Sequence, residues 1–379
     1  MDTPTKLLYI ANLRLPTEKA YGIQIVKMCE AFGLQGIDVT LLHPLRNNHV
    51  KEDIFSYYPV EKKFNTKIVW APDFYFPGRL DKASVNIKGV ISAVILCFYA
   101  VTRKSDIVYS RDEWPLYFLS FFRKNLFFEA HRFSKLRRVF YRRFLGQNIK
   151  IISISENLKK NFLNMGFKDA DVLVAHDGVD LNNFSTPISK EEARGRVNLS
   201  KDSKIAMYTG HLFPWKGADI LGETAKLIPN MEFVFVGGMD ADIENFKNKF
   251  SKVKNISVLG HRSHKEIPVF LRAADILVLP NSAKEDISGY TSPLKLFEYM
   301  ASGRPIVSSD LPSIREILNE NNSVLVRPDS PEELARGIKL ILDRTDSGEG
   351  LAKKAFEDVK NYTWERRASK IASFIRRQV

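Results

Sequence analysis

The chain has 379 residues, of which 44% are hydrophobic and 27% are charged. This length predicts two domains, and this composition excludes a largely disordered protein. The formal net charge of +13 favours anionic partners of some kind. Because only two cysteines are present, Cys29 and Cys97, we expect no disulfide framework and no cysteine-based metal site, and a cytoplasmic location is the simplest expectation.

Short β-rich apolar runs alternate with longer helical patterns along the chain, as in parallel α/β layers. The first half predicts a helix over Ile23–Leu34 and six strands, at Leu7–Ile10, Val39–Leu42, Ile107–Ser110, Leu126–Glu129, Ile151–Ser155 and Val172–Val174. A connection over Asp180–Ser203 follows. The second half predicts a helix over Ser292–Ala301 and strands at Lys204–Thr209, Glu232–Val236, Ile256–Leu259, Ile276–Leu279, Pro305–Ser308 and Ser323–Val326.

Each series of strands predicts a doubly wound parallel sheet, whose ligands bind at the carboxyl ends of the strands. We therefore expect two Rossmann-like domains, over residues 1–184 and 185–361, with a cleft between them that holds two half-sites. The last segment, residues 362–379, is expected to form a helix that crosses back onto the first domain.

Two segments bear on membrane contact. Gly89–Val101 is shorter than the roughly 20 apolar residues of a membrane-spanning helix, so we interpret it as a buried helix, with an interfacial helix as the alternative. The segment from Arg132 to Phe144 predicts a basic amphipathic helix, which favours contact with an anionic membrane; a half-buried helix with a solvated face is the alternative. Its apolar side would hold Phe133, Leu136, Phe140 and Phe144, and its basic side Arg132, Lys135, Arg138 and Arg142.

Nucleic acid is not an expected partner, because the chain contains no zinc-finger spacing, no aromatic-basic RNA-binding signature and no basic tail. A metal ion is not expected either. Asp240 and Asp242 have the spacing of metal-binding transferases, but they follow a Gly-Gly turn and are interpreted as a helix start. Paired zinc-type spacing is absent among His43, His49, His176, His261 and His264.

The segment Tyr208–Gly217 predicts a strand, a glycine-containing loop and the start of a helix. Gly210 permits a tight turn at the end of the strand. Lys216 stands just before the helix, where its ammonium group and the helix N-terminus can both face a phosphate. A plain turn with a surface lysine is the alternative.

The segment Thr291–Ser309 predicts a polar loop, a short helix and a strand. We expect Ser292 to cap the helix and Pro293 to occupy its first position, so that the first-turn amides of Leu294 and Lys295 face the cleft. One turn later, the carboxylate of Glu298 suits the paired hydroxyls of a ribose, with a surface glutamate as the alternative.

Taken together and in order, these motifs resemble the retaining glycosyltransferases of family four, which have the GT-B fold of two Rossmann-like domains. The resemblance implies that the first domain is on the acceptor side and that the second binds the nucleotide sugar. The resemblance covers nearly the whole chain, and the ordered series is specific although no single piece is. It rests on Ala20–Gln24, Phe128–His131, Ile152–Glu156, His176–Asp180, Gly210–Gly217, Val236–Gly238, Gly260–Arg262, Ala274–Pro280 and Phe297–Ala301.

The resemblance implies a role for individual residues. Gly22 would bring the backbone of the first domain close to the donor diphosphate, and His131 would lie near the transferred sugar and the acceptor. Lys216 would hold the diphosphate and Glu298 the ribose, which makes His131, Lys216 and Glu298 the candidate catalytic residues. The rest of the donor site would come from Gly210, His211, Gly238, His261, Arg262, Ser292, Leu294 and Lys295.

Three positions depart from the family pattern. His211 stands where relatives often have an arginine that pairs with the lysine on the diphosphate. Tyr290 stands where they commonly have a glutamate that contacts the donor sugar, and Pro293 replaces a glycine whose N–H can bind phosphate. Our hypothesis is that Lys295 compensates for the missing arginine. A carboxylate for the sugar would then come from Glu285 or Asp286.

The reaction implied by the resemblance is transfer of a sugar from a UDP- or GDP-linked donor, with retention of anomeric configuration and without a metal ion or other cofactor. Same-face attack is expected, since no clear carboxylate nucleophile is offered for a double displacement. The expected acceptor is a glycan or polyprenyl-linked glycan at the inner face of the cell membrane, hence polysaccharide biosynthesis. A nucleotide-sugar-binding protein without transferase activity, an epimerase and a phosphorylase of the same architecture are the alternatives.

Overall fold

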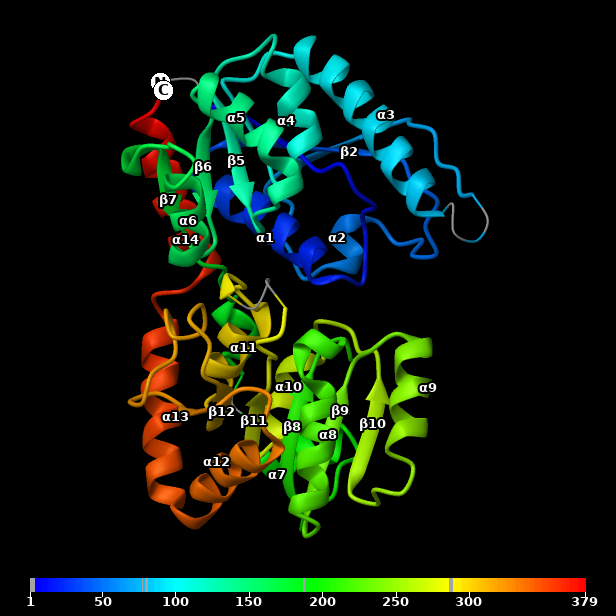
Figure 1. Ribbon diagram of the computed structural model, residues 1–379, viewed down its shortest axis with the longest axis vertical. Coiled ribbons are helices and arrows are strands. Elements are labelled where there is room, and N and C mark those ends of the chain that lie inside the picture. The colour runs from blue at the N-terminus through cyan, green and yellow to red at the C-terminus, as the bar shows by residue number, and fades with distance from the viewer. Residues whose placement is uncertain (1–3, 77, 79–80, 187, 286–288) are drawn as a thin grey trace. The chain divides into compact units, whose positions relative to one another are not determined.

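The computed structural model describes residues 4–76, 78, 81–186, 188–285 and 289–379. Two compact units divide the chain: residues 1–176 together with 364–379, and residues 177–363 (Figure 1). The C-terminal helix therefore belongs to the first unit. Both units are layered α/β structures with wholly parallel sheets, which is the GT-B fold class.

The first unit is built on a seven-stranded sheet in the order β3-β2-β1-β4-β5-β6-β7. Its central strands are continuous apolar runs whose residues are buried, as expected where helices cover both faces of a parallel sheet. In β1 and β4, for example, Tyr9 lies opposite Tyr109. The strands are β1 (Lys6–Ile10), β2 (Asp38–Pro44), β3 (Asn65–Val69), β4 (Ile107–Ser110), β5 (Leu126–Ala130), β6 (Lys150–Ser153) and β7 (Val172–Val174).

Among the described residues of the first unit, seven helices accompany this sheet. α1 packs against the C-terminal helix α14, whereas α3, α4 and α5 pack in succession against one another. Asp53 and Ser155 cap α2 and α6 by accepting hydrogen bonds from first-turn amides. The helices are α1 (Ala20–Leu34), α2 (Ile54–Tyr57), α3 (Asp81–Val101), α4 (Glu113–Leu119), α5 (Arg138–Gly146), α6 (Glu156–Leu163) and α14 (Trp364–Arg376).

The second unit has a six-stranded sheet in the order β10-β9-β8-β11-β12-β13, with buried apolar clusters on both faces. Its strands are β8 (Lys204–Thr209), β9 (Met231–Val236), β10 (Ile256–Gly260), β11 (Ile276–Leu279), β12 (Ile306–Ser309) and β13 (Val324–Val326). Its helices are α7 (Lys190–Arg196), α8 (Ala218–Leu227), α9 (Asp240–Lys249), α10 (Ile267–Ala273), α11 (Leu294–Ser302), α12 (Pro331–Asp343) and α13 (Thr345–Val359).

Strand β3 was not predicted from the sequence. It lies at the edge of the sheet and its side chains are mostly exposed, so it has no apolar run to mark it. All twelve predicted strands are present with small differences at their ends. The predicted connection over Asp180–Ser203 contains a 3₁₀ turn (Leu181–Phe184) and α7.

Helix α3 differs from the prediction of a short buried helix. It begins at Asp81, and its part Ala83–Val101 is the one helix among the described residues that is long and apolar enough to cross a membrane by length and composition. Only 39% of that segment is buried. A stripe at helical spacing is exposed instead, and Phe98 in it is 75% exposed; the stripe consists of Ile87, Ile91, Val94, Phe98 and Val101.

The predicted amphipathic helix of Arg132–Phe144 is also corrected. Regular helix starts only at Arg138, after a 3₁₀ turn over Lys135–Arg137. Phe140 and Phe144 are buried as predicted, but Leu136 is 93% exposed because the 3₁₀ turn does not continue the apolar side of α5.

Candidate functional site

The loop after β8 places Lys216 at the start of α8. Gly210 leaves the strand with φ +119, a conformation that favours glycine. A 3₁₀ turn over Pro214–Lys216 follows, and Gly217 enters α8 with φ +75. A Cβ at Gly217 would lie 1.7 Å from the Pro280 carbonyl oxygen, so this turn packs directly on the end of β11.

Helix α11 begins differently from the prediction. The Ser292 side chain does not cap it; its Oγ accepts a hydrogen bond from the Asp177 backbone N–H, at 3.1 Å. Pro293 occupies the N-cap rather than the first helical position, and no side chain of the described residues caps the helix. The first helical residues are therefore Leu294 and Lys295, whose amides have no acceptor within the helix itself.

Lys295 reaches from α11 to the end of β8. Its buried Nζ donates to the Thr209 carbonyl oxygen at 3.0 Å and lies 3.6 Å from the centre of the Tyr208 ring. The same atom is 3.6 Å from where a Cβ on Gly210 would stand. The Lys295 amine thus lies beside the glycine turn, which continues to His211, whose ring stacks on Phe213 with centroids 5.0 Å apart.

Three titratable side chains of this cluster influence one another. Burial lowers the pKa of Lys216 to about 8. Burial, and then repulsion from Lys216, lower the pKa of Lys295 well below its usual value. Burial raises the pKa of Glu298 to about 7, against the opposing effect of Lys295. The excess positive charge of the two lysines would be stabilised by an anion such as a diphosphate.

Two glycines after β9 close the same edge of the sheet. Gly237 and Gly238 have φ +114 and +101, and a Cβ on Gly237 would lie 2.7 Å from the Gly210 carbonyl oxygen. The glycine loops after β8 and β9 therefore touch backbone to backbone. His261 and Arg262 directly follow β10, the edge strand that pairs with β9, and both side chains are exposed.

In the first unit, Gly22 lies in the first turn of α1 and is buried. A Cβ there would lie 2.1 Å from the Tyr58 hydroxyl oxygen and 2.7 Å from Thr17. Tyr58 in turn accepts from the Thr17 backbone N–H and donates to its carbonyl oxygen. Close packing against Tyr58 and Thr17 thus explains why position 22 is a glycine. The contact of Gly22 with a donor diphosphate stays a prediction.

His131 follows β5 and is held by Glu129. The Nε2 atom of His131 lies 2.7 Å from a Glu129 carboxylate oxygen, and the Glu129 side chain is 0% exposed. Gln24 donates to the same oxygen at 2.6 Å, and the Tyr109 hydroxyl donates to the other. A carboxylate only accepts, so His131 Nε2 carries the hydrogen.

Arg367 of α14 completes this network. Its guanidinium donates to Glu129 at 2.8 Å and to the His176 carbonyl oxygen at 2.9 Å. Burial alone would raise the pKa of Glu129, but the charge of Arg367 and the hydrogen bond from His131 hold it well below its usual value. The carboxylate therefore stays ionised and fixes the orientation of the His131 ring.

Glu129 and Arg367 were not predicted as functional residues. The signal for Glu129 is a charged residue inside the apolar strand Leu126–Ala130, since such a residue requires a partner. Arg367 lies on the buried side of α14 among apolar residues. The sequence around either residue does not identify the other as its partner.

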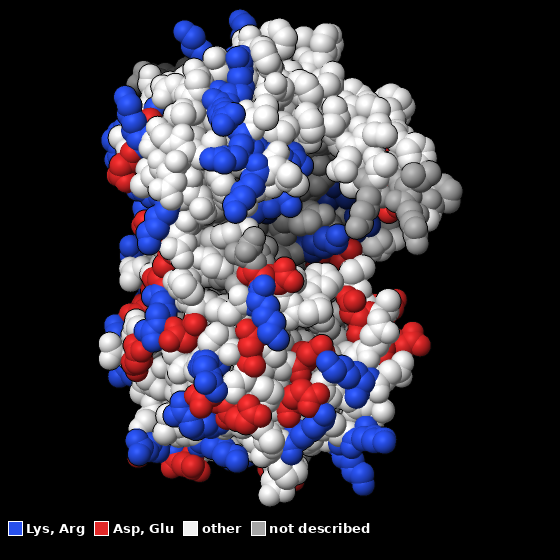
Figure 2. Space-filling model, in the orientation of Figure 1, with Lys and Arg blue, Asp and Glu red and all other residues white. Residues whose placement is uncertain are grey.

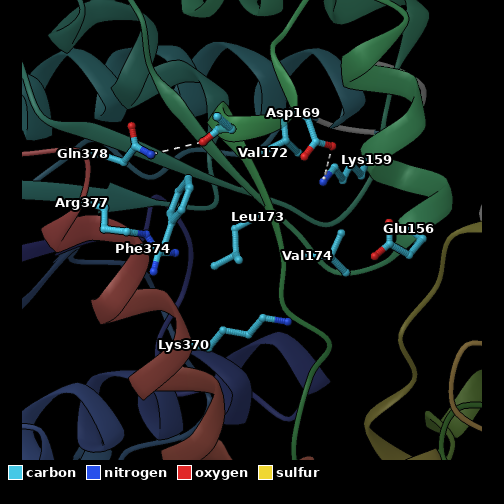
Figure 3. A pocket seen from close by; sticks show the side chains of 11 residues that line it. Glu156, Lys159, Asp169, Val172, Leu173, Val174, Lys370, Phe374, Arg377 and Gln378 are labelled. Atoms are coloured by element: carbon cyan, nitrogen blue, oxygen red, sulfur yellow. Dashed lines mark hydrogen bonds and ion pairs between the residues drawn. The ribbon is translucent and has the colours of Figure 1, made fainter.

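A cavity of about 540 Å³ lies between α14 and the edge strand β7 (Figure 3). Lys370 of α14 and Arg377, which follows this helix, border it opposite the ion pair of Lys159 and Asp169 at 2.7 Å. None of its lining residues belongs to the predicted donor site, and the side chains of Lys370 and Arg377 are exposed.

Other predicted features fall outside the cluster. Asp240 and Asp242 lie in the first turn of α9, as predicted. Glu285 is described as an exposed residue, whereas Asp286 lies outside the described residues.

The sequence comparisons place this geometry in a known group. Residues 203–344 match the family of glycosyl transferases group 1, and this range contains the loop of Lys216 and the helix of Glu298. TuaC of Bacillus subtilis (strain 168), a glycosyltransferase named for teichuronic acid biosynthesis, is 24% identical over 363 residues, which are 88% of each chain. The chain is a glycosyltransferase, and its residues 203–344 are similar to the group 1 family.

A second relative of this glycosyltransferase is the UDP-Gal:alpha-D-GlcNAc-diphosphoundecaprenol alpha-1,3-galactosyltransferase of Escherichia coli. It is 31% identical over 150 residues, 37% of each chain, so the match spans little more than a third of that enzyme.

Solved structures agree with the fold of the glycosyltransferase. HepE from Anabaena, in complex with UDP and glucose, has a TM-score of 0.77 at 16% identity, with 98% of this chain and 99% of that chain covered. WaaG, a glycosyltransferase involved in lipopolysaccharide biosynthesis, has a TM-score of 0.69 at 14% identity, with 97% and 99% covered. At these identities the likeness concerns the GT-B fold alone.

Proposed function

We propose that this glycosyltransferase moves a sugar from a nucleoside-diphosphate sugar, UDP-linked or GDP-linked, to a glycan or polyprenyl-linked glycan, with retention of anomeric configuration, in cell-surface polysaccharide biosynthesis. The observation that carries the proposal is the cluster of Lys216, Lys295 and Glu298 at the carboxyl end of β8. UDP is the first nucleotide to test, since HepE was solved in complex with UDP and with UDP-glucose.

The chemical requirement is stabilisation of the charge that develops on the departing diphosphate. Lys216 and Lys295 supply two cations, and the first amides of α11 supply hydrogen-bond donors at the positive end of the helix dipole. We therefore propose that transfer needs no metal ion. Glu298 would accept hydrogen bonds from the ribose hydroxyls, and His131 would orient the acceptor or donor sugar.

The proposal predicts selective stabilisation by one nucleoside diphosphate. UDP, GDP, ADP and CMP, and their sugar conjugates, are added to the protein and the thermal midpoint is recorded. A ligand at about 100 times its dissociation constant adds about 2.7 kcal/mol of stability. We expect one diphosphate to raise the midpoint, and Glu298→Ala to reduce that rise. If none of the nucleotides changes the midpoint, the proposed donor site is wrong.

A further part of the proposal is peripheral contact with an anionic membrane at its cytoplasmic face. The exposed stripe of α3 ends beside Arg103 and Lys104, and the turn after α4 adds the exposed Phe121 and Phe122. The guanidinium carbon of Arg143, on α5, lies 3.9 Å from the centre of the Phe121 ring, so α5 adds a cation to this surface. On the visible face in Figure 2, the first unit is largely white with a band of Lys and Arg, whereas the second carries mixed charges.

Apolar side chains bordered by cations are the pattern of interfacial membrane contact. We predict that the protein sediments with vesicles of phosphatidylcholine and phosphatidylglycerol at low salt, and less at high salt. Because burying one large apolar side chain contributes roughly 1.5–3 kcal/mol, Phe98→Ser should weaken this binding about tenfold or more. Leu227→Ser, an exposed apolar position of the second unit, is the matched control. A wild-type protein that stays in the supernatant at low salt would contradict the proposal.

A further inference from the structure

The first unit contains a cavity of about 790 Å³ that none of the predicted site residues lines. It lies at the carboxyl ends of β2 and β3, the edge at which parallel α/β sheets bind ligands. Its volume is within the range of small-molecule sites. The lining includes His43, Leu45, Asn47, Ile68 and Trp70.

Trp70 is the most conspicuous side chain of this cavity. It directly follows β3 and is 69% exposed, and its neighbours Ile68 and Leu45 are exposed as well. A large aromatic ring exposed at the mouth of a concave site is a platform for a ligand with an apolar face.

His43, near the end of β2, lines the same cavity and has a buried acceptor. Its Nδ1 lies 3.3 Å from the Pro44 carbonyl oxygen, which can only accept, so Nδ1 carries the hydrogen. Burial lowers the pKa of His43 to about 4, so the ring is neutral at pH 7. The Nε2 atom is therefore an acceptor, and among the described residues it has no hydrogen-bond partner. A buried acceptor in this state favours a ligand that donates a hydrogen bond.

The charges around the cavity do not favour an anion. Arg46 is engaged by the Pro72 carbonyl oxygen, the Ser92 hydroxyl and Asp73, which also pairs with Lys88 at 2.9 Å. The remaining charged lining residues have both signs: Lys51, Glu52 and Asp53. With its cations balanced by carboxylates, the cavity suits a neutral ligand with many hydroxyl groups better than a phosphate.

We propose that this cavity binds a sugar unit of the acceptor glycan, with its C–H face on Trp70 and a hydroxyl donating to His43 Nε2. This inference rests on the proposed function and narrows the acceptor side, which the resemblance places in the first domain, to one cavity. Arg46 also donates to Ser92 of α3, so the cavity adjoins the helix with the exposed apolar stripe. A lipid-linked glycan held at a membrane surface by its lipid would thus have its sugars beside Trp70.

The test uses the four tryptophans of the chain as separate reporters. The protein is labelled with 5-fluorotryptophan, and the fluorine signals are assigned by Trp→Phe variants. Methyl glycosides of glucose, galactose and N-acetylglucosamine, and chitobiose, are then added in turn. We expect a saturable shift of the Trp70 signal with at least one of them, and no shift of Trp114 or Trp364. His43→Phe should abolish the shift, and Trp70→Ala should weaken binding, followed by calorimetry, about tenfold.

The same sample separates failure of this inference from failure of the proposed function. Trp215 lies beside Lys216, with the ammonium 5.2 Å from the ring centre, and therefore reports nucleotide binding. A Trp215 shift with UDP or GDP, without any Trp70 shift from the saccharides, would overturn the acceptor site alone. A Trp70 shift produced by inorganic phosphate and not by the saccharides would also overturn it. No Trp215 shift with any nucleotide would count against the donor site instead.

Discussion

Replacing Arg367 by Met is expected to lower the free energy of unfolding by about 3–5 kcal/mol. The side chains of Arg367 and Glu129 are 2% and 0% exposed, so the substitution leaves a buried carboxylate without its main counter-charge. Unfolding in urea, followed by circular dichroism, measures the loss. Arg376→Met on the exposed side of the same helix is the control and should change stability by about 0.5 kcal/mol or less.

The double variant Glu129→Gln with Arg367→Met should recover part of the lost stability, because no uncompensated charge is then buried. The pH dependence supports the same test. The pKa of Glu129 is lowered in the folded state, so its stabilisation is present above the unfolded-state pKa of about 4.3 and is lost as the pH falls through the folded-state pKa. An Arg367→Met protein as stable as the wild type would show that the ion pair contributes nothing.

Replacing Lys216 by Ala is expected to reduce kcat about 10²–10³-fold, the usual effect of removing one preorganised group that stabilises a developing negative charge. The measurement is release of nucleoside diphosphate from the donor that the thermal test selects, with acceptor present and with EDTA in the buffer. Lys226→Ala is the control, since Lys226 lies on α8 and pairs with Glu223 on the surface.

The ionisation of Lys216 gives this prediction a pH dependence. Since burial lowers the pKa of Lys216 to about 8, the free protein loses this cation as the pH rises through 8, and the dissociation constant of the donor should rise there. In Lys216→Ala that rise should be much smaller. Equal turnover of Lys216→Ala and wild type would mean that Lys295 alone carries the diphosphate.

Most of the fold was predictable because the strands are buried on both faces. Ile276–Leu279 and Val172–Val174, for instance, are short apolar runs with clear ends, and the structure has them with those bounds. The edge strand β3 was missed because Asn65–Val69 is largely exposed and has no such run. The length of α3 was missed because its first turns are polar and the helix continues through them.

The candidate site was predictable only where its residues lie close together in the sequence. The loop to Lys216 and the helix from Leu294 could each be read locally, and the structure adds the contact of Lys295 with the end of β8. The cap was wrong, because Ser292 binds the Asp177 amide instead. Arg367 and Glu129 are 238 residues apart, and no local pattern connects residues at that distance.

The return of the last helix to the first unit has a consequence for synthesis on the ribosome. Domains usually fold from the N-terminus as they emerge, yet residues 1–176 lack α14 until residues 364–376 have been translated. The second unit, residues 177–363, is contiguous and can close its own core first. During that interval Glu129 lacks its counter-charge from Arg367. The surface of α1 that α14 later covers is exposed to solvent and to chaperones. The first unit, although most of it is translated first, is thus expected to be completed after the second.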